Sequence, residues 1–164
     1  MKISDISIFK ELSTNSKNVI DEAAQFVSFR IGQPIILNGI IPNKVFIIIE
    51  GEARLIISKD DEKTTIAKLG QGTILGLAPI LCAKGFEEVI ASTDIKSIAI
   101  PDNLIVNLYK VENQFRDYCN STKFPSEIAG ITELLIQKSD RTDIQFRKAF
   151  NLCMNNSKIE TITN

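Results

Sequence analysis

The fold class is decided by the stretch Val45-Phe46-Ile47-Ile48-Ile49-Glu50-Gly51-Glu52-Ala53-Arg54-Leu55-Ile56-Ile57-Ser58. It contains two short runs rich in β-branched residues, with Glu50-Gly51-Glu52 between them. Isoleucine and valine favour strands because a β-branched side chain fits a pleated, half-buried surface. Glycine tolerates the positive φ that a tight turn requires. The stretch therefore predicts two antiparallel strands joined by a hairpin.

The same pattern extends to both sides, between about residues 25 and 101. The further short apolar runs are 26–31, 34–37, 64–69, 88–92 and 96–101, and glycine, asparagine and proline mark the turns between them. Strands this short with turns this regular predict an antiparallel β sandwich or barrel. We expect the charged segment 59–63 to be an exposed hairpin tip.

Helical spacing replaces the strand pattern on both flanks. Residues 3–24 read as helical with a polar break at 13–16, and Asp102 is expected to be the N-cap of a helix after the strands. The apolar stripe of that helix consists of Leu104, Leu108, Val111, Phe115 and Tyr118. We expect the stripe to pack on the open side of the barrel. The alternative is a homodimer through 104–118, because the same spacing suits a coiled-coil seam.

Two more helices are expected toward the C-terminus. One begins at Ser126 and turns Ile128, Ile131, Leu134 and Leu135 inward. The other begins at the capping box Thr142-Asp143-Ile144-Gln145 and carries Phe146, Ala149, Phe150 and Cys153. The expected organisation is a domain over 1–122, with its barrel at about 25–101 and helices at 102–122, followed by a helical appendage or linker over 123–164.

Composition restricts the functional class. Lys and Arg total 19 against 20 for Asp and Glu, so no basic excess favours nucleic acid. The chain has no histidine, which excludes His-dependent triads and imidazole metal sites. No other residue pattern suggests a nucleophile with its base. We therefore expect no catalytic residue, no metal site and no cofactor, and the chain is not expected to be an enzyme.

The cysteines and the apolar stretches indicate a cytoplasmic protein. Cys82, Cys119 and Cys153 lie far apart, which suits a reducing compartment in which each thiol is a small buried hydrophobe. Asp5 lies where a signal peptide needs its apolar core. The longest charge-free stretch, 69–83, contains three glycines and a proline and is too short to span a bilayer.

Several glycine-centred segments fall at compatible spacings between Phe29 and Gly76. They are Phe29-Arg30-Ile31-Gly32-Gln33-Pro34-Ile35, Val45 to Leu55, Leu69-Gly70-Gln71-Gly72 and Leu75-Gly76. Together they resemble the cyclic nucleotide-binding domain family, to which the cAMP receptor protein-like regulators belong. The resemblance covers about residues 5–120. It implies a mainly β fold with flanking helices, an antiparallel jelly roll also described as a double-stranded β-helix.

The resemblance also locates a binding cassette. Family members use a segment like Phe-Gly-Glu-Leu-Ala followed by Arg-x-Ala-Thr, in which a short helix N-terminus and the Arg hold the cyclic phosphate and the Glu binds the ribose. The corresponding residues here are Leu75-Gly76-Leu77-Ala78-Pro79 and Gly85-Phe86-Glu87-Glu88-Val89. Leu77 replaces the ribose-binding acid, and Gly85 stands near the Arg position. The implied site is a degenerate pocket formed by Leu75, Gly76, Leu77, Ala78, Lys84, Gly85, Glu87 and Glu88.

The lost contacts predict that cAMP and cGMP do not bind. An Arg–phosphate contact contributes roughly 1.5–3 kcal/mol, and Glu87 and Glu88 add repulsion where it would stand. Lys84 is the nearest cation, and we expect it to be solvated. We expect the cavity either to bind another small, uncharged ligand or to be filled by Leu77 and its neighbours. Glu87 and Glu88 adjoin in an expected strand, so their side chains should point to opposite faces and form no dyad.

A narrower resemblance suggests a partner. Residues 75–83 and 88–93 look like the degenerate cassette of domains fused ahead of bacterial peptide or toxin ABC exporters, and Glu133-Leu134-Leu135-Ile136 is similar to the helical linker after such a domain. The sequence has no Gly-x-x-x-x-Gly-Lys-Ser/Thr phosphate loop, so no ATPase is expected in these residues. The implied function is a regulatory or protein-interaction domain that contacts a transporter or another protein.

Two alternatives remain, a cAMP receptor-type transcriptional regulator and a true cyclic-nucleotide sensor. Residues 123–164 contain six basic and five acidic residues. A recognition helix that enters a DNA groove requires a more basic face, so nucleic acid is the less favoured partner.

Overall fold

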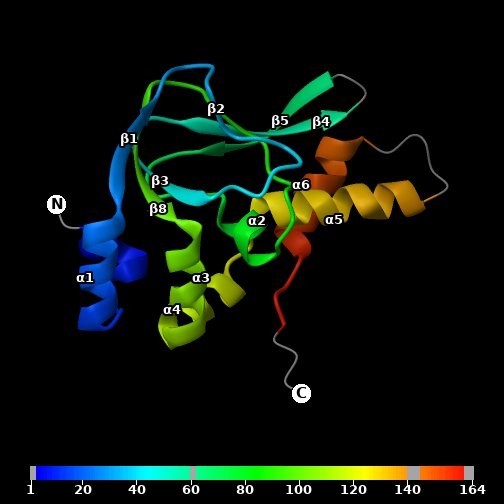
Figure 1. Ribbon diagram of the computed structural model, residues 1–164. Coiled ribbons are helices and arrows are strands. Elements are labelled where there is room, and N and C mark those ends of the chain that lie inside the picture. Colours follow the sequence, from blue (N-terminus) through cyan, green and yellow to red (C-terminus); the bar gives the residue numbers. More distant parts are fainter. Residues whose placement is uncertain (1–2, 60–61, 140–144, 161–164) are drawn as a thin grey trace.

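Two antiparallel sheets form the centre of the molecule, and helices flank them (Figure 1). The computed structural model describes residues 3–59, 62–139 and 145–160. The strands in these residues are β1 (Gln25–Phe29), β2 (Pro34–Ile36), β3 (Lys44–Glu50), β4 (Ala53–Lys59), β5 (Glu62–Leu69), β6 (Ile74–Leu75), β7 (Val89–Ala91) and β8 (Ile95–Pro101). One sheet has the order β1-β8-β3-β6 and the other β2-β7-β4-β5. The fold class expected from the sequence, antiparallel β with flanking helices, is confirmed.

Strand β6 was not predicted from the sequence. It has two residues and pairs with β3, where Phe46 lies opposite Leu75 and Ile47 opposite Ile74. A two-residue strand carries no recognisable hydrophobic period. Its pairing nevertheless fixes the backbone that leads directly into Gly76.

The helices are η1 (Ile3–Asp5), η2 (Ser7–Phe9), α1 (Thr14–Ala23), α2 (Leu77–Leu81), α3 (Asp102–Val111), α4 (Asn113–Ser121), α5 (Pro125–Lys138) and α6 (Phe146–Asn156). The Ser13 hydroxyl caps α1 by accepting from the Ser16 amide at 3.3 Å. The helix expected after the strands is divided at Glu112 into α3 and α4. Pro101, and not Asp102, is the N-cap of α3.

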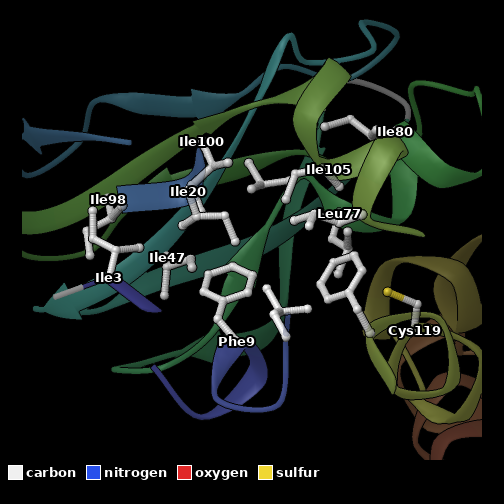
Figure 2. Close-up of a cluster of buried hydrophobic side chains, with 14 residues drawn as sticks. Ile3, Phe9, Ile20, Ile47, Leu77, Ile80, Ile98, Ile100, Ile105 and Cys119 are labelled. Atoms are coloured by element: carbon white, nitrogen blue, oxygen red, sulfur yellow. The ribbon is translucent and has the colours of Figure 1, made fainter. Parts of the chain in front are cut away.

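A first core cluster lies between one face of the β1-β8-β3-β6 sheet and the N-terminal helices, α3 and α4 (Figure 2). Val45 and Ile47 of β3 and Ile98 and Ile100 of β8 enter it, because alternate side chains of a strand share one face. The helices contribute Phe9, Ile20, Ile105, Leu108 and Phe115, among others.

The apolar stripe of residues 104–118 is largely used in this first cluster. Leu108 and Phe115 are buried, Leu104 and Tyr118 are half-buried, and Val111 is 59% exposed. The stripe therefore packs within its own domain, on the face of the sheet that β3 and β8 form, and the expectation that it covers the barrel is confirmed except at Val111. Because the helix is divided at Glu112, α3 packs on β3 and β8 while α4 packs against α3 and η2.

A second core cluster fills the space between the two sheets. It contains Ile36, Ile48, Leu55, Leu69, Leu75 and Val89 from the strands. Ala129 of α5 and Phe150 of α6 complete it, and Phe150 is 3% exposed. Helices α5 and α6 thus supply part of the barrel's core, and Figure 1 shows them below β4 and β5, away from α1.

The face of α5 that points inward differs from the expected one. Ile128 is half-buried, but Ile131, Leu134 and Leu135 are 52%, 52% and 57% exposed. Ser126, Ala129 and Thr132 are the buried residues of α5, and Ala129 packs in the second core cluster. The two leucines lie on another face of the same helix. Of the expected capping box at 142–145, residues 142–144 fall outside the described residues, and α6 begins at Phe146 with Gln145 as its N-cap.

We predict that Phe150→Ala lowers the free energy of unfolding by about 3 kcal/mol or more, because it removes a buried aromatic ring and leaves a cavity between the sheets. Urea denaturation measures the change. Leu152→Ala is the matched control on the same helix. Leu152 is 58% exposed, so its truncation should change stability by less than about 0.5 kcal/mol. Equal effects of the two substitutions would contradict the packing of α6 into the barrel.

Candidate functional site

The turn after β6 is built around Gly76. This residue has φ 81° and is the N-cap of α2, in a left-handed conformation that favours glycine. A Cβ atom at Gly76 would lie 3.0 Å from Pro42 Cγ and 3.2 Å from the carbonyl oxygen of Lys44. The positive φ and the close approach of neighbouring chain both require glycine, and they direct the Gly76 amide toward Glu87.

Glu87 is the acidic residue at this turn. Its Oε2 accepts a hydrogen bond from the Gly76 amide at 2.8 Å, and the residue is 6% exposed. The Ser126 hydroxyl, in the first turn of α5, also donates to the carboxylate. The backbone amide at the start of α2 is therefore already hydrogen-bonded to a carboxylate of the protein itself.

The burial of Glu87 changes its ionisation. Removal of the carboxyl group from water raises its pKa from 4.5 to about 7, although the hydrogen bonds from Gly76 and Ser126 act in the opposite direction. Burial outweighs the hydrogen bonds because the charged form loses most of its hydration. Glu87 consequently exchanges its proton near neutral pH.

A small cavity of about 190 Å³ lies beside Glu87. Its apolar wall includes Leu55, Leu69 and Phe124. Its polar groups come from distant parts of the chain, namely Thr73, Glu87, Tyr118, Lys123 and Ser126. The Lys123 ammonium donates to the Met154 carbonyl of α6 at 3.5 Å. An apolar chamber with a few convergent polar groups and a perturbed acid is the usual character of a small-ligand site.

Glu88 faces a different environment from Glu87. Its carboxylate accepts from the Ser58 hydroxyl and from the Lys63 ammonium, both at 2.7 Å. Burial opposes the ionisation of Glu88, but the hydrogen bonds from Lys63 and Ser58 and the charge of Lys63 hold its pKa below the ordinary value. The two acids therefore have separate partners and do not form a carboxylate pair.

Gly85 is packed against a neighbouring loop. The Gly39 amide donates to the Gly85 carbonyl at 3.1 Å, and a Cβ atom at Gly85 would lie 2.5 Å from the Ile40 nitrogen and 2.6 Å from the Gly39 carbonyl carbon. The backbone of this loop leaves no room for a side chain at residue 85. The side chain that reaches the Gly76 turn is that of Glu87, two residues later.

The other sequence-predicted site residues lie apart from the cavity. Leu77 is 1% exposed and packs in the first core cluster with Ile105 and Phe115 (Figure 2), so it does not fill the cavity. Ala78 is buried in α2, and Leu75 is buried between the sheets. Lys84 is exposed and lines a wider groove of about 740 Å³ between the cassette and α5.

The structure adds site residues that sequence reasoning missed. Thr73 is near the cassette in sequence, but Tyr118, Lys123 and Ser126 come from α4, from the link to α5 and from α5 itself. The helix start at Phe124-Pro125-Ser126 was recognisable from proline at a first helical position. Its location beside Glu87 was not recognisable, because it depends on how α5 packs on the barrel.

The three cysteines differ in their exposure to solvent. Cys119 is buried and Cys153 is half-buried, but Cys82 is exposed, so the expectation that all are buried is wrong for Cys82. The Cys82 thiol donates to Glu127 Oε1 at 3.1 Å. Burial of the sulfur, the hydrogen bond to Glu127 and the charge of Glu127 raise the pKa of Cys82 to about 11, so the thiol is protonated at neutral pH.

The described residues contain no group of three or more His, Cys, Asp or Glu side chains placed to hold a metal ion. Over the same part of the chain, none of the helices combines the length and the apolar character needed to cross a membrane.

Solved structures with the same fold include three informative examples. The regulatory subunit of a cAMP-independent protein kinase A from Trypanosoma brucei is 19% identical over 74% of this chain and 49% of its own, with a TM-score of 0.56. The equivalent protein from Trypanosoma cruzi, bound to guanosine, is 20% identical over 71% of this chain and 45% of its own, with a TM-score of 0.55. This chain thus spans about half the length of these two proteins.

The third example is a candidate transcriptional regulator of the Crp/Fnr family from Eubacterium rectale. It is 18% identical over 88% of this chain and 78% of its own, with a TM-score of 0.63. At such identities the likeness concerns the fold alone. A search of curated proteins finds no match. The family model for the cyclic nucleotide-binding domain matches residues 26–112, which is more than half of the sequence. This chain therefore belongs to the cyclic nucleotide-binding domain family.

Proposed function

We propose that this chain is a regulatory or protein-interaction domain, not an enzyme, whose cassette does not bind cAMP or cGMP. The observation that carries the proposal is the 2.8 Å hydrogen bond from the Gly76 amide to the buried Glu87 carboxylate. A cyclic phosphate would compete for the same amide and, where Glu87 is ionised, would meet a group of like charge. The protein's own acid thus takes the position that the family resemblance assigns to the ligand's phosphate.

Two further features support the loss of nucleotide binding. The backbone of Gly39 and Ile40 closes on Gly85, so an arginine cannot stand there without displacement of the loop. Leu77, at the position of the ribose-binding acid, is buried in the first core cluster. The cation that lines the small cavity is Lys123, whose ammonium donates to α6.

The chemistry of the cavity favours an uncharged ligand. A carboxyl group offers hydrogen-bond acceptors to hydroxyl and amino groups, and the apolar wall formed by Leu55, Leu69 and Phe124 excludes water from them. The relative from Trypanosoma cruzi is bound to guanosine, a nucleoside without phosphate. We therefore propose that any small molecule that enters beside Glu87 is a neutral hydrogen-bond donor.

We also propose that the domain acts in the cytoplasm on another protein, such as an ABC exporter. The unpaired cysteines suit a reducing compartment. The exposed side chains of Ile131, Leu134 and Leu135 on α5 supply apolar surface for a partner. Membrane spans and a phosphate loop encoded beyond Asn164 would support the exporter assignment, and a stop codon directly after it would weaken it.

The second candidate function is transcriptional regulation, which the likeness to the Eubacterium rectale protein favours. In that case α6, with Arg147 and Lys148 exposed, would have to contact DNA. Phe150 anchors the same helix in the barrel core. Tight, salt-sensitive binding of duplex DNA in a gel shift would support this function over the first.

We predict that isothermal titration calorimetry detects no binding of cAMP or cGMP to the wild-type chain below millimolar concentration. Like charge at Glu87 and an occupied Gly76 amide both oppose the phosphodiester. Guanosine, titrated in parallel, separates the loss of phosphate binding from the loss of all ligand binding. A micromolar dissociation constant for either cyclic nucleotide would overturn the proposed function.

We predict that Glu87→Ala strengthens the binding of cAMP at least tenfold relative to wild type, because it frees the Gly76 amide and removes the like charge. Calorimetry on both proteins measures the ratio, after thermal unfolding has shown that the variant is folded. Glu88→Ala is the matched control, since Glu88 bonds to Ser58 and Lys63 instead. The same gain in both variants would mean that overall charge, and not the occupied amide, excludes the nucleotide.

A further inference from the structure

Glu87 lies where the cassette meets the helices that close the barrel. We call helices α5 (Pro125–Lys138) and α6 (Phe146–Asn156) the cover. Glu87 bonds to the cassette through the Gly76 amide and to the cover through Ser126, which is 3% exposed. Phe150 anchors the other helix of the cover in the barrel core. Any movement of α5 away from the barrel would therefore expose Glu87 to water.

Among the residues that the structure describes, none forms an ion pair with Glu87. On the walls of the adjoining cavity the other charged and titratable groups are Lys123 and Tyr118. The Lys123 ammonium donates to the Met154 carbonyl of the cover. The neighbouring acids, Glu88 and Glu127, have partners of their own in Lys63 and Cys82.

Both protonation states of Glu87 can be accommodated, but at different cost. A protonated carboxyl keeps a carbonyl oxygen that accepts from the Gly76 amide and gains a hydroxyl that can donate to Ser126. The ionised form has to be buried without a cation, which is unfavourable. Release of the cover would return the carboxylate to water and remove that cost.

We propose that Glu87 is a proton-binding site that controls the docking of the cover: binding of a proton favours the closed cover, and ionisation favours its release. The inference concerns the protein without any ligand, so it does not depend on whether a nucleotide binds. According to this proposal, the local pH regulates the domain. The element that responds is the cover, which carries the exposed apolar face of α5.

The sign and size of the effect follow from proton linkage. The closed form has a Glu87 pKa of about 7 and the open form the ordinary value of 4.5, so the closed form binds the proton more tightly. Closure is therefore most favoured below pH 4.5 and loses this contribution as the pH rises through 7. Between pH 6 and pH 8 the closed-to-open ratio should fall roughly tenfold.

Hydrogen exchange on the full chain tests the proposal. Protection factors, corrected for the pH dependence of intrinsic exchange, are compared at pH 6 and pH 8. In the wild type, amides of α5 and α6 should lose about tenfold in protection at pH 8, while those of α1 and β8 change little. Glu87→Gln, which keeps an acceptor for Gly76 and carries no charge, should hold the cover closed at both pH values.

The matched control is Glu88→Gln, which alters the next residue and should retain the pH dependence of the wild type. A second measurement, the titration of the Glu87 carboxyl carbon by NMR, should show a midpoint near 7. A midpoint near 4.5 would overturn the proposal. So would a pH dependence that Glu87→Gln preserves, or one that is equal in α1 and in the cover.

Discussion

The hydrogen bond between the Gly76 amide and the Glu87 carboxylate organises the centre of this molecule. It depends on three independent features: the left-handed turn that only glycine adopts readily, the two-residue strand β6 that presents this turn, and the chain reversal that returns Glu87 to it. Since the acid is buried, the bond does more than join two segments. It places a group with a perturbed pKa at the boundary between the barrel and its C-terminal helices.

The β1-β8-β3-β6 sheet separates two cores with different roles. On one side, Val45 and Ile47 pack with the N-terminal helices, α3 and α4. On the other side, Ile48 and Leu75 face the space between the sheets, which Ala129 and Phe150 complete. The first core stabilises the scaffold. The second depends on helices that come late in the sequence and that touch the candidate site.

The local sequence pattern was sufficient to predict the fold, but it was insufficient to predict which residues meet at the candidate site. The alternation of isoleucines around Glu50-Gly51-Glu52 predicted β3 and β4, and glycine spacing predicted the family. Helical spacing alone could not tell which side of α5 faces the barrel, because leucine and isoleucine occupy several of its faces. The buried residues are the smaller ones, Ser126, Ala129 and Thr132. The partners of Glu87 could not be predicted from the sequence either. Ser126 lies 39 positions away along the chain and contacts Glu87 only because α5 packs on the barrel.

The close contact between Gly85 and the Gly39–Ile40 backbone limits how two separate loops can vary in sequence. The atoms nearest to a Cβ at residue 85 belong to the backbone, so rotation of a neighbouring side chain cannot relieve the contact. Any larger residue at position 85 would have to shift the Gly39–Ile40 loop, and the same shift would disturb the hydrogen bond from the Gly39 amide to the Gly85 carbonyl. The two loops are therefore interlocked, and a substitution in one of them requires an adjustment in the other.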